Sequence, residues 1–243
     1  MSVPFENLKD IWIEGNIGAG KSTLGGLLAL KTGYMLLEEP VDRNPYLKDF
    51  YEALKSGTCA SSRIAITMQF FLLGNRYIDH ISSRIASIRH GTISDRSLPG
   101  DTVFATCMLQ DGHIDDRDYK SYMQLFRAMS LMVGKPDVMI YLRTDPEISY
   151  QRTNSRKREV EKEVPLAYFQ KLHQHYEALI DMLRGNYTIL ELDWNIPWHI
   201  DDVVATLKEL DQTVKKPYLH VDLAKGAHNL ETLYAANYGF LKR

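Results

Sequence analysis

The chain has 243 residues, of which 44% are hydrophobic and 25% are charged, which is the composition of an ordinary globular protein. Its formal net charge of -2 provides no positive field for nucleic acid or an anionic membrane, so we expect small-molecule partners and neither a nucleic acid polymer nor a membrane. Cys59 and Cys107 lack C-x-x-C spacing, which predicts buried thiols in a reducing compartment. With the first strand beginning too early for a signal peptide, we expect a cytoplasmic protein.

The first predicted element is a buried strand at residues 11–13, followed by a glycine-rich loop and a helix. The loop fits G-x-x-x-x-G-K-[ST], the phosphate-binding P-loop. Its glycines let backbone N–H groups face a phosphate, the Lys21 ammonium adds charge at the β- and γ-phosphates, and the Ser22 hydroxyl can ligate Mg²⁺. The predicted nucleotide site is Gly15, Asn16, Ile17, Gly18, Ala19, Gly20, Lys21, Ser22 and Thr23.

Strands and helices alternate along the rest of the chain. Short apolar runs predict strands at 34–37, 92–94, 137–142 and 187–192. Apolar residues at three- and four-residue steps predict helices at 46–55, 60–90, 117–133, 168–183 and 201–214. This alternation predicts an α/β protein with a five-stranded parallel sheet, helices on both faces, and ligands at the carboxyl ends of the strands.

Charged residues follow the second and third predicted strands and are expected to face the P-loop. Glu39 could accept a proton from an acceptor hydroxyl, and a plain surface carboxylate is the alternative. Asp95 could hold magnesium-bound water, and Arg96 could keep Glu39 ionised by pairing with it; alternatively Asp95 and Arg96 form a local ion pair. The charged run 152–163 indicates either a solvated helix face or a lid that brings arginines onto a γ-phosphate.

Five stretches in this order resemble the deoxynucleoside kinase family: the P-loop, Glu39-Pro40-Val41, Asp95-Arg96-Ser97, the arginine-rich run and Val164-Pro165-Leu166-Ala167-Tyr168. The resemblance implies a P-loop kinase fold with a kinase domain over residues 1–211, a lid at 152–163 and an extension over residues 212–243. It also implies that the ATP γ-phosphoryl group is transferred, with Mg²⁺, to the 5′-hydroxyl of a deoxynucleoside.

The resemblance assigns the reacting groups as follows. Glu39 would be the general base, Arg96 its partner, and Ser22 and Asp95 the residues at the metal. Lys21, Arg152 and Arg156 would act on the phosphoryl groups, while Arg158 would lie near the donor nucleotide and Asp193-Trp194-Asn195 beside its adenine.

The resemblance also assigns a nucleoside pocket. Tyr51 and Glu161 would bind the sugar 3′-hydroxyl, and Gln69 would bind the base edge. Met68 stands where many members have an aromatic residue against the base, and Tyr168 closes the lid motif. Asn44-Pro45-Tyr46-Leu47 follows the bacterial-type branch of the family.

Arg76 and Asp101 bear on the choice of base. In the family this pairing accompanies deoxycytidine, deoxyadenosine and deoxyguanosine. An aspartate held by arginine accepts a hydrogen bond from an exocyclic amine or ring N–H and crowds the 5-methyl group of thymine. We expect a purine, deoxyadenosine first. The alternatives are a deoxycytidine-preferring or broad deoxynucleoside kinase, a nucleoside monophosphate kinase, and a non-catalytic P-loop nucleotide-binding protein.

Apolar residues on the predicted helices 60–90 and 117–133 exceed what one sheet face needs, and family members usually pair through helices at these positions. The extension also carries large apolar residues that need cover: Tyr218, Leu219, Leu230, Leu233, Tyr234, Tyr238, Phe240 and Leu241. We expect a homodimer or higher homo-oligomer in which the extension contacts another subunit; the alternative is an extension folded over its own subunit.

Overall fold

The computed structural model describes residues 5–38, 44–155 and 164–214. Within these residues, five parallel strands form one sheet in the order β2-β3-β1-β4-β5. The strands are β1 (Asp10–Glu14), β2 (Met35–Leu37), β3 (Thr92–Asp95), β4 (Val138–Arg143) and β5 (Ile189–Asp193). The predicted five-stranded parallel sheet is confirmed.

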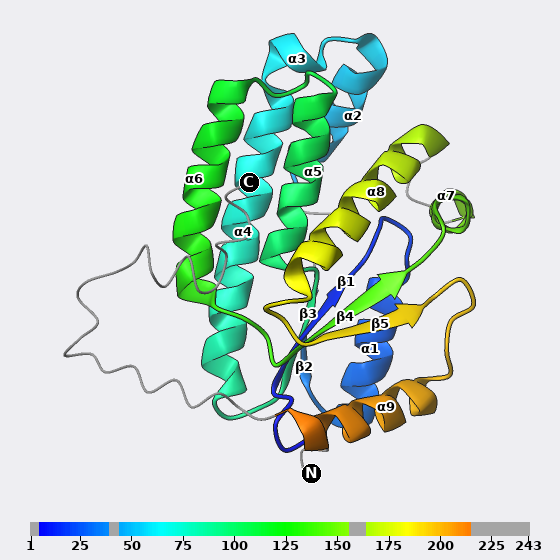
Figure 1. Cartoon of the computed structure of the whole chain (residues 1–243). Coiled ribbons are helices and arrows are strands. Elements are labelled where there is room, and N and C mark those ends of the chain that lie inside the picture. Colours follow the sequence, from blue (N-terminus) through cyan, green and yellow to red (C-terminus); the bar gives the residue numbers. More distant parts are fainter. Residues whose placement is uncertain (1–4, 39–43, 156–163, 215–243) are drawn as a thin grey trace, which may run out of the picture.

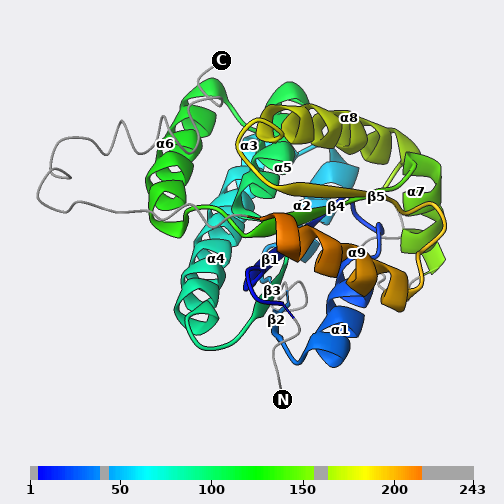
Figure 2. The ribbon, with the colours of Figure 1, turned by 60° about the horizontal axis from the view of Figure 1, so that its bottom comes forward.

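Helices cover both faces of the sheet (Figure 1). One face carries α1 (Lys21–Thr32) and α9 (Ile200–Thr213), which the turned view in Figure 2 shows below the strands. The other face carries α4 (Ile64–Ser87), α5 (Leu98–Gln110), α6 (Asp116–Val133) and α8 (Leu166–Leu183). The remaining described helices lie towards the carboxyl ends of the strands and are α2 (Leu47–Ser56), α3 (Cys59–Ser62) and α7 (Pro146–Ser155).

Strand β1 shows why the sheet is covered on both sides. Trp12 belongs to the apolar core beneath α4, α5, α6 and α8, whereas Ile11 and Ile13 belong to the core beneath α1 and α9. Successive side chains on a strand point to opposite faces, so an apolar run without polar interruption requires cover on both. All of β1 is buried, and its last residue, Glu14, leads directly into the P-loop.

Helices α4 and α5 differ from the sequence prediction, and α3 and α7 were not predicted as separate helices. The helix predicted over 60–90 begins only at Ile64, because Arg63 takes a left-handed conformation with φ of 58° and separates α3 from α4. Helix α5 was not predicted. Its Leu98-Pro99-Gly100 start is typical of a turn, but proline is tolerated in a first helical turn, and the Ser97 hydroxyl caps the helix by accepting from the Gly100 N–H. Much of α5 is buried, so no single apolar stripe marks it.

The two ends of the described chain are joined by Asp211 of α9. Its buried carboxylate accepts hydrogen bonds from the backbone N–H groups of Glu6 (2.8 Å), Asn7 (2.7 Å) and Leu8 (2.8 Å). These contacts hold the segment that enters β1 against the helix that covers the sheet.

A buried polar cluster lies at the amino end of β1, opposite the P-loop. The Asp10 carboxylate accepts hydrogen bonds from Trp12 Nε1 (3.1 Å) and Ser83 Oγ (3.2 Å) and lies 3.7 Å from the Arg84 guanidinium. The His80 ring packs on Trp12 with 4.3 Å between ring centroids, and neither ring nitrogen has a hydrogen-bond partner among the described residues. Burial, the largest cause in each case, raises the pKa of Asp10 to about 6 and lowers the pKa of His80 to about 3.

We expect His80→Phe to change how stability depends on pH. Below pH 6.5, His80 is protonated in the unfolded chain but stays neutral in the folded protein. The free energy of unfolding of the wild type therefore decreases as the pH falls from 6.5 towards 3. The contribution of Asp10 to the free energy of unfolding has the opposite pH dependence. Because folding raises its pKa, this contribution is lost as the pH rises from 3.8 through 6. Without His80, the contribution of Asp10 is the one that remains from this cluster.

The difference in unfolding free energy between His80→Phe and wild type should therefore move in favour of the variant on acidification below pH 6.5. The expected slope of this difference is about 1.4 kcal/mol per pH unit, measured by urea unfolding at several pH values. A difference that does not vary with pH would mean that His80 is not held neutral in the fold.

Candidate active site

The P-loop joins the carboxyl end of β1 to the first turn of α1. Gly18 and Gly20 have φ angles of 73° and 103°. In this left-handed region a residue with a side chain would be strained. A Cβ on Gly18 would also lie 2.4 Å from the Ser149 carbonyl oxygen of α7, so glycine is needed for close packing as well. Lys21 Nζ donates to the carbonyl oxygens of Gly15 (2.9 Å) and Asn16 (2.8 Å), which holds the ammonium inside the loop.

Glu14 ties the P-loop to the turn that follows β3. One carboxylate oxygen accepts from the Gly15 N–H (3.0 Å), and the other accepts from the Ser97 N–H (2.9 Å) and hydroxyl (2.6 Å). A Cβ on Gly100 would lie 2.0 Å from this carboxylate. Sequence reasoning missed Glu14; its signal was a carboxylate between the apolar run of β1 and the first glycine of the P-loop.

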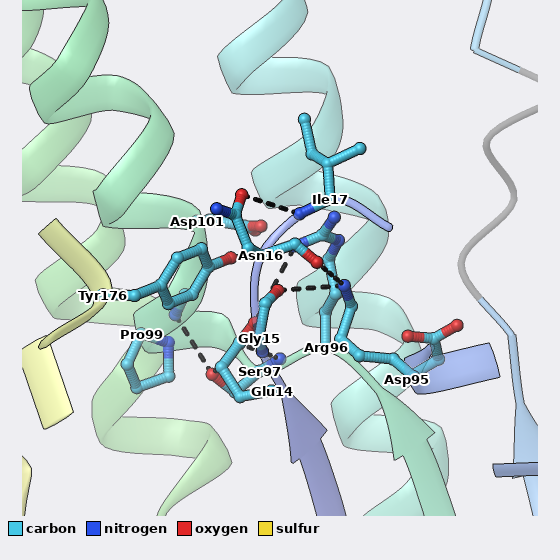
Figure 3. A network of polar contacts seen from close by, with 12 residues as sticks. Glu14, Gly15, Asn16, Ile17, Asp95, Arg96, Ser97, Pro99, Asp101 and Tyr176 are labelled. Atoms are coloured by element: carbon cyan, nitrogen blue, oxygen red, sulfur yellow. Dashed lines mark hydrogen bonds and ion pairs between the residues drawn. The ribbon is translucent and has the colours of Figure 1, made fainter. Parts of the chain in front are cut away.

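Arg96 occupies this turn with an uncommon positive φ of 83°. Its Nη1 donates to the Tyr176 hydroxyl (2.9 Å) and lies 3.8 Å from a Glu14 oxygen, and its guanidinium carbon lies 5.0 Å from the centroid of the Phe104 ring. Figure 3 shows Glu14, Arg96 and Tyr176 gathered around the start of the P-loop. The expected partner of Arg96, Glu39, lies outside the described residues, as do Arg156, Arg158 and Glu161 of the predicted lid and the predicted extension beyond residue 214.

Ser22 and Asp95 meet beside the P-loop. The Ser22 hydroxyl donates to one Asp95 carboxylate oxygen at 2.5 Å. The other oxygen is buried and has no hydrogen-bond partner among the described residues. Because a buried carboxylate oxygen needs a partner and Mg²⁺ takes oxygen ligands, this pair fits a magnesium ion.

The residues expected to contact the base come together on α4 and α5. Arg76 donates from Nε to Asp101 at 3.1 Å and pairs through Nη2 at 3.1 Å, and the two side chains are 5% and 3% exposed. Gln69 is buried and donates from Nε2 to the sulfur of Met108 (3.4 Å), while its Oε1 has no hydrogen-bond partner among the described residues. This oxygen is therefore suited to accept a hydrogen bond from a ligand.

One cleft of about 120 Å³ connects these groups with the P-loop. The predicted residues that line it are Ile17, Gly18, Lys21, Ser22, Tyr51, Met68, Gln69, Arg76, Asp95, Arg96, Asp101 and Tyr168. A mostly apolar cavity of about 350 Å³ adjoins it and shares Phe50, Tyr51, Met108 and Tyr168. Sequence reasoning missed Phe50, Phe104 and Met108, the last two because they lie on the unpredicted helix α5.

Arg152 makes a contact that the sequence did not indicate. Its Nη2 donates to the carbonyl oxygens of Trp194 (3.0 Å) and Asn195 (2.8 Å), and its Nη1 donates to that of Ala19 (3.4 Å). Arg152 thereby joins the P-loop to the segment after β5, where the donor adenine is expected. In this arrangement its guanidinium binds main-chain carbonyls, and contact with the transferred phosphoryl group stays a prediction.

Cys59 and Cys107 are buried free thiols, as predicted. Burial raises the pKa of Cys107 to about 12 and also raises that of Cys59, so neither is a thiolate at neutral pH. None of the helices in the described ranges is long and apolar enough to cross a bilayer.

Comparisons with known proteins match this chain to deoxynucleoside kinases by family, by sequence and by structure. The family described as "Deoxynucleoside kinase" matches residues 11–214. A deoxyadenosine kinase of Dictyostelium discoideum is 34% identical over 189 residues, covering 76% of this chain and 72% of the relative. A deoxyadenosine/deoxycytidine kinase of Bacillus subtilis (strain 168) is 35% identical over 173 residues, covering 70% and 76%. The structure of deoxyadenosine kinase from M. mycoides with bound dATP aligns with a TM-score of 0.69 at 27% identity, covering 81% of this chain and 97% of that one.

Proposed function

Because this chain belongs to the deoxynucleoside kinase family and is a phosphotransferase, we propose that it transfers the γ-phosphoryl group of ATP to the 5′-hydroxyl of a purine deoxynucleoside, deoxyadenosine above all. The buried Arg76–Asp101 pair in the same cleft as the P-loop carries the choice against thymidine, and the deoxyadenosine kinases among the relatives support adenine among the remaining bases. Asp101 is an acceptor whose position is fixed by a guanidinium, and adenine offers an exocyclic amine to such an acceptor.

In the proposed reaction, Glu39 and Arg96 act at the acceptor hydroxyl, and Lys21 and the P-loop act on the phosphates of ATP. The acceptor 5′-oxygen attacks the γ-phosphorus, its proton passes to Glu39, and the bond from the γ-phosphorus to the β,γ-bridging oxygen breaks. Lys21 and the P-loop N–H groups hold the phosphates, and Arg96 places positive charge beside Glu39. When bound at Ser22 and Asp95, Mg²⁺ would neutralise phosphate charge.

A panel of acceptors tests this function. The purified protein is given ATP, Mg²⁺ and one of deoxyadenosine, deoxyguanosine, deoxycytidine, thymidine or dAMP, and ATP consumption gives kcat/KM for each. Among the nucleosides, we expect deoxyadenosine to be highest and thymidine lowest. If kcat/KM is highest with deoxycytidine, the preferred acceptor is deoxycytidine. Phosphorylation of dAMP but of no nucleoside would indicate a nucleoside monophosphate kinase. No turnover with any acceptor would support a non-catalytic nucleotide-binding protein.

We also propose that the protein is a homodimer or larger homo-oligomer through α4 and α6, which lie side by side in both ribbon views. Large apolar side chains are exposed there: Ile78 (61%) and Ile85 (66%) on α4, Ile88 (82%) just after it, and Met132 (65%) on α6. Burying each would contribute about 1.5–3 kcal/mol.

Light scattering of the full chain and of a chain that ends at Thr213 tests this assembly. We expect at least two subunits for the full chain and fewer subunits for the shortened one. An equal number of subunits would show that the extension does not assemble the oligomer, and a single subunit for both would contradict the proposed interface.

A further inference from the structure

We propose that Tyr176 is a positioning residue that orients Arg96 for phosphoryl transfer through its hydroxyl group. This inference rests on the proposed function. It assigns a role in the reaction to a residue of α8 that lies 80 positions from Arg96 in the sequence and belongs to none of the family motifs noted above.

The Tyr176 side chain is fully buried and held from two sides. Its ring stacks on Tyr141 of β4, with 6.4 Å between centroids and 27° between planes, and meets the Phe104 ring of α5 edge-on at 6.3 Å. The Tyr176 hydroxyl is therefore a fixed point on the sheet face, and Arg96 Nη1 donates to it at 2.9 Å.

The neutral character of this acceptor matters for the reaction. Glu14 lies 3.8 Å from the same Nη1, but its two oxygens already accept from Gly15 and Ser97. A hydroxyl directs the guanidinium by a hydrogen bond without cancelling its charge, whereas a carboxylate at the same distance would neutralise part of it. The hydrogen bond to Tyr176 thus fixes the direction of Arg96 without adding a further negative charge beside it.

Tyr176→Phe removes only the hydroxyl and keeps the stacked ring. We expect kcat for deoxyadenosine to fall about 10- to 100-fold, because a misdirected guanidinium no longer matches the reacting geometry. KM for ATP should stay within about twofold of wild type, since the P-loop contacts are unchanged.

Tyr141→Phe is the matched control. Tyr141 belongs to the same stack and is equally buried, but its hydroxyl bonds to Glu177 on α8 and not to Arg96. This variant should keep kcat within about twofold of wild type. Thermal unfolding of both variants checks that the stack is retained.

A double mutant separates positioning from general support of the fold. If Tyr176 acts through Arg96, Tyr176→Phe should lower kcat by less than about twofold when it is introduced into Arg96→Lys. Additive losses in the double variant, or an unchanged kcat in Tyr176→Phe alone, would overturn the inference. Failure of the proposed function would instead show as a wild-type protein that phosphorylates no deoxynucleoside.

Discussion

Replacing Glu39 by glutamine is expected to lower kcat about 10²- to 10⁴-fold, the range for loss of a positioned general base, while substrate binding is retained. The register of the sheet supports this expectation. Leu37, the last residue of β2, pairs with Ser94 of β3, so the strand before Glu39 ends beside the strand before Arg96. A carboxylate close to the Arg96 guanidinium would be favoured in its ionised form.

The neighbouring residue provides a matched control for this variant. Glu38 is exposed at the end of β2, so Glu38→Gln makes the same chemical change one position away and should leave kcat unaffected. Steady-state and single-turnover rates with deoxyadenosine measure both variants. If Glu39→Gln and Glu38→Gln have the same kcat, Glu39 is not the base.

Replacing Asp101 by alanine is expected to have two effects. It removes the carboxylate partner of the buried Arg76 guanidinium, which should lower the free energy of unfolding by about 3–5 kcal/mol. It also removes an acceptor from the cleft and opens space for a methyl group. The ratio of kcat/KM for deoxyadenosine to that for thymidine should therefore fall by about 10²-fold or more.

A second variant separates these two effects. Because well-packed apolar residues often replace a buried ion pair without loss of stability, Arg76→Met combined with Asp101→Leu should recover most of the unfolding free energy lost in Asp101→Ala. It should not recover the preference for deoxyadenosine. Urea unfolding and the four-nucleoside panel measure the two properties, and an unchanged ranking in both variants would show that the pair supports only the fold.

The parts of the site that were predictable from sequence depend on local chemistry. The P-loop is recognisable because glycine spacing, a lysine and a serine must occur together, and Asp95 and Arg96 are marked by the end of a strand. The identity of Arg76 and Asp101 as a pair came from family resemblance, and the structure brings their side chains together across α4 and α5.

Other parts carried no local signal. Helix α5 is buried on most sides, so the apolar stripe that marks other helices is absent, and its proline and glycine are typical of a turn. Glu14 and Tyr176 reach their partners across 83 and 80 sequence positions, and no periodicity predicts contacts of that range. Arg152 was placed in a charged run, but only the packing of α7 on the P-loop shows which carbonyl groups it reaches.

The hydrogen bonds between Asp211 and the segment before β1 bear on the order in which the protein folds during synthesis. The central strand is synthesised before its neighbours β3 and β4, which follow about 80 and 130 residues later, and Asp211 comes 205 positions after Glu6. Strand β1 therefore has no neighbouring strand until β3 has been made, and its upstream segment is fixed by Asp211 later still. Because the central strand depends on partners so far along the chain, we expect these contacts of long sequence separation to limit the folding rate.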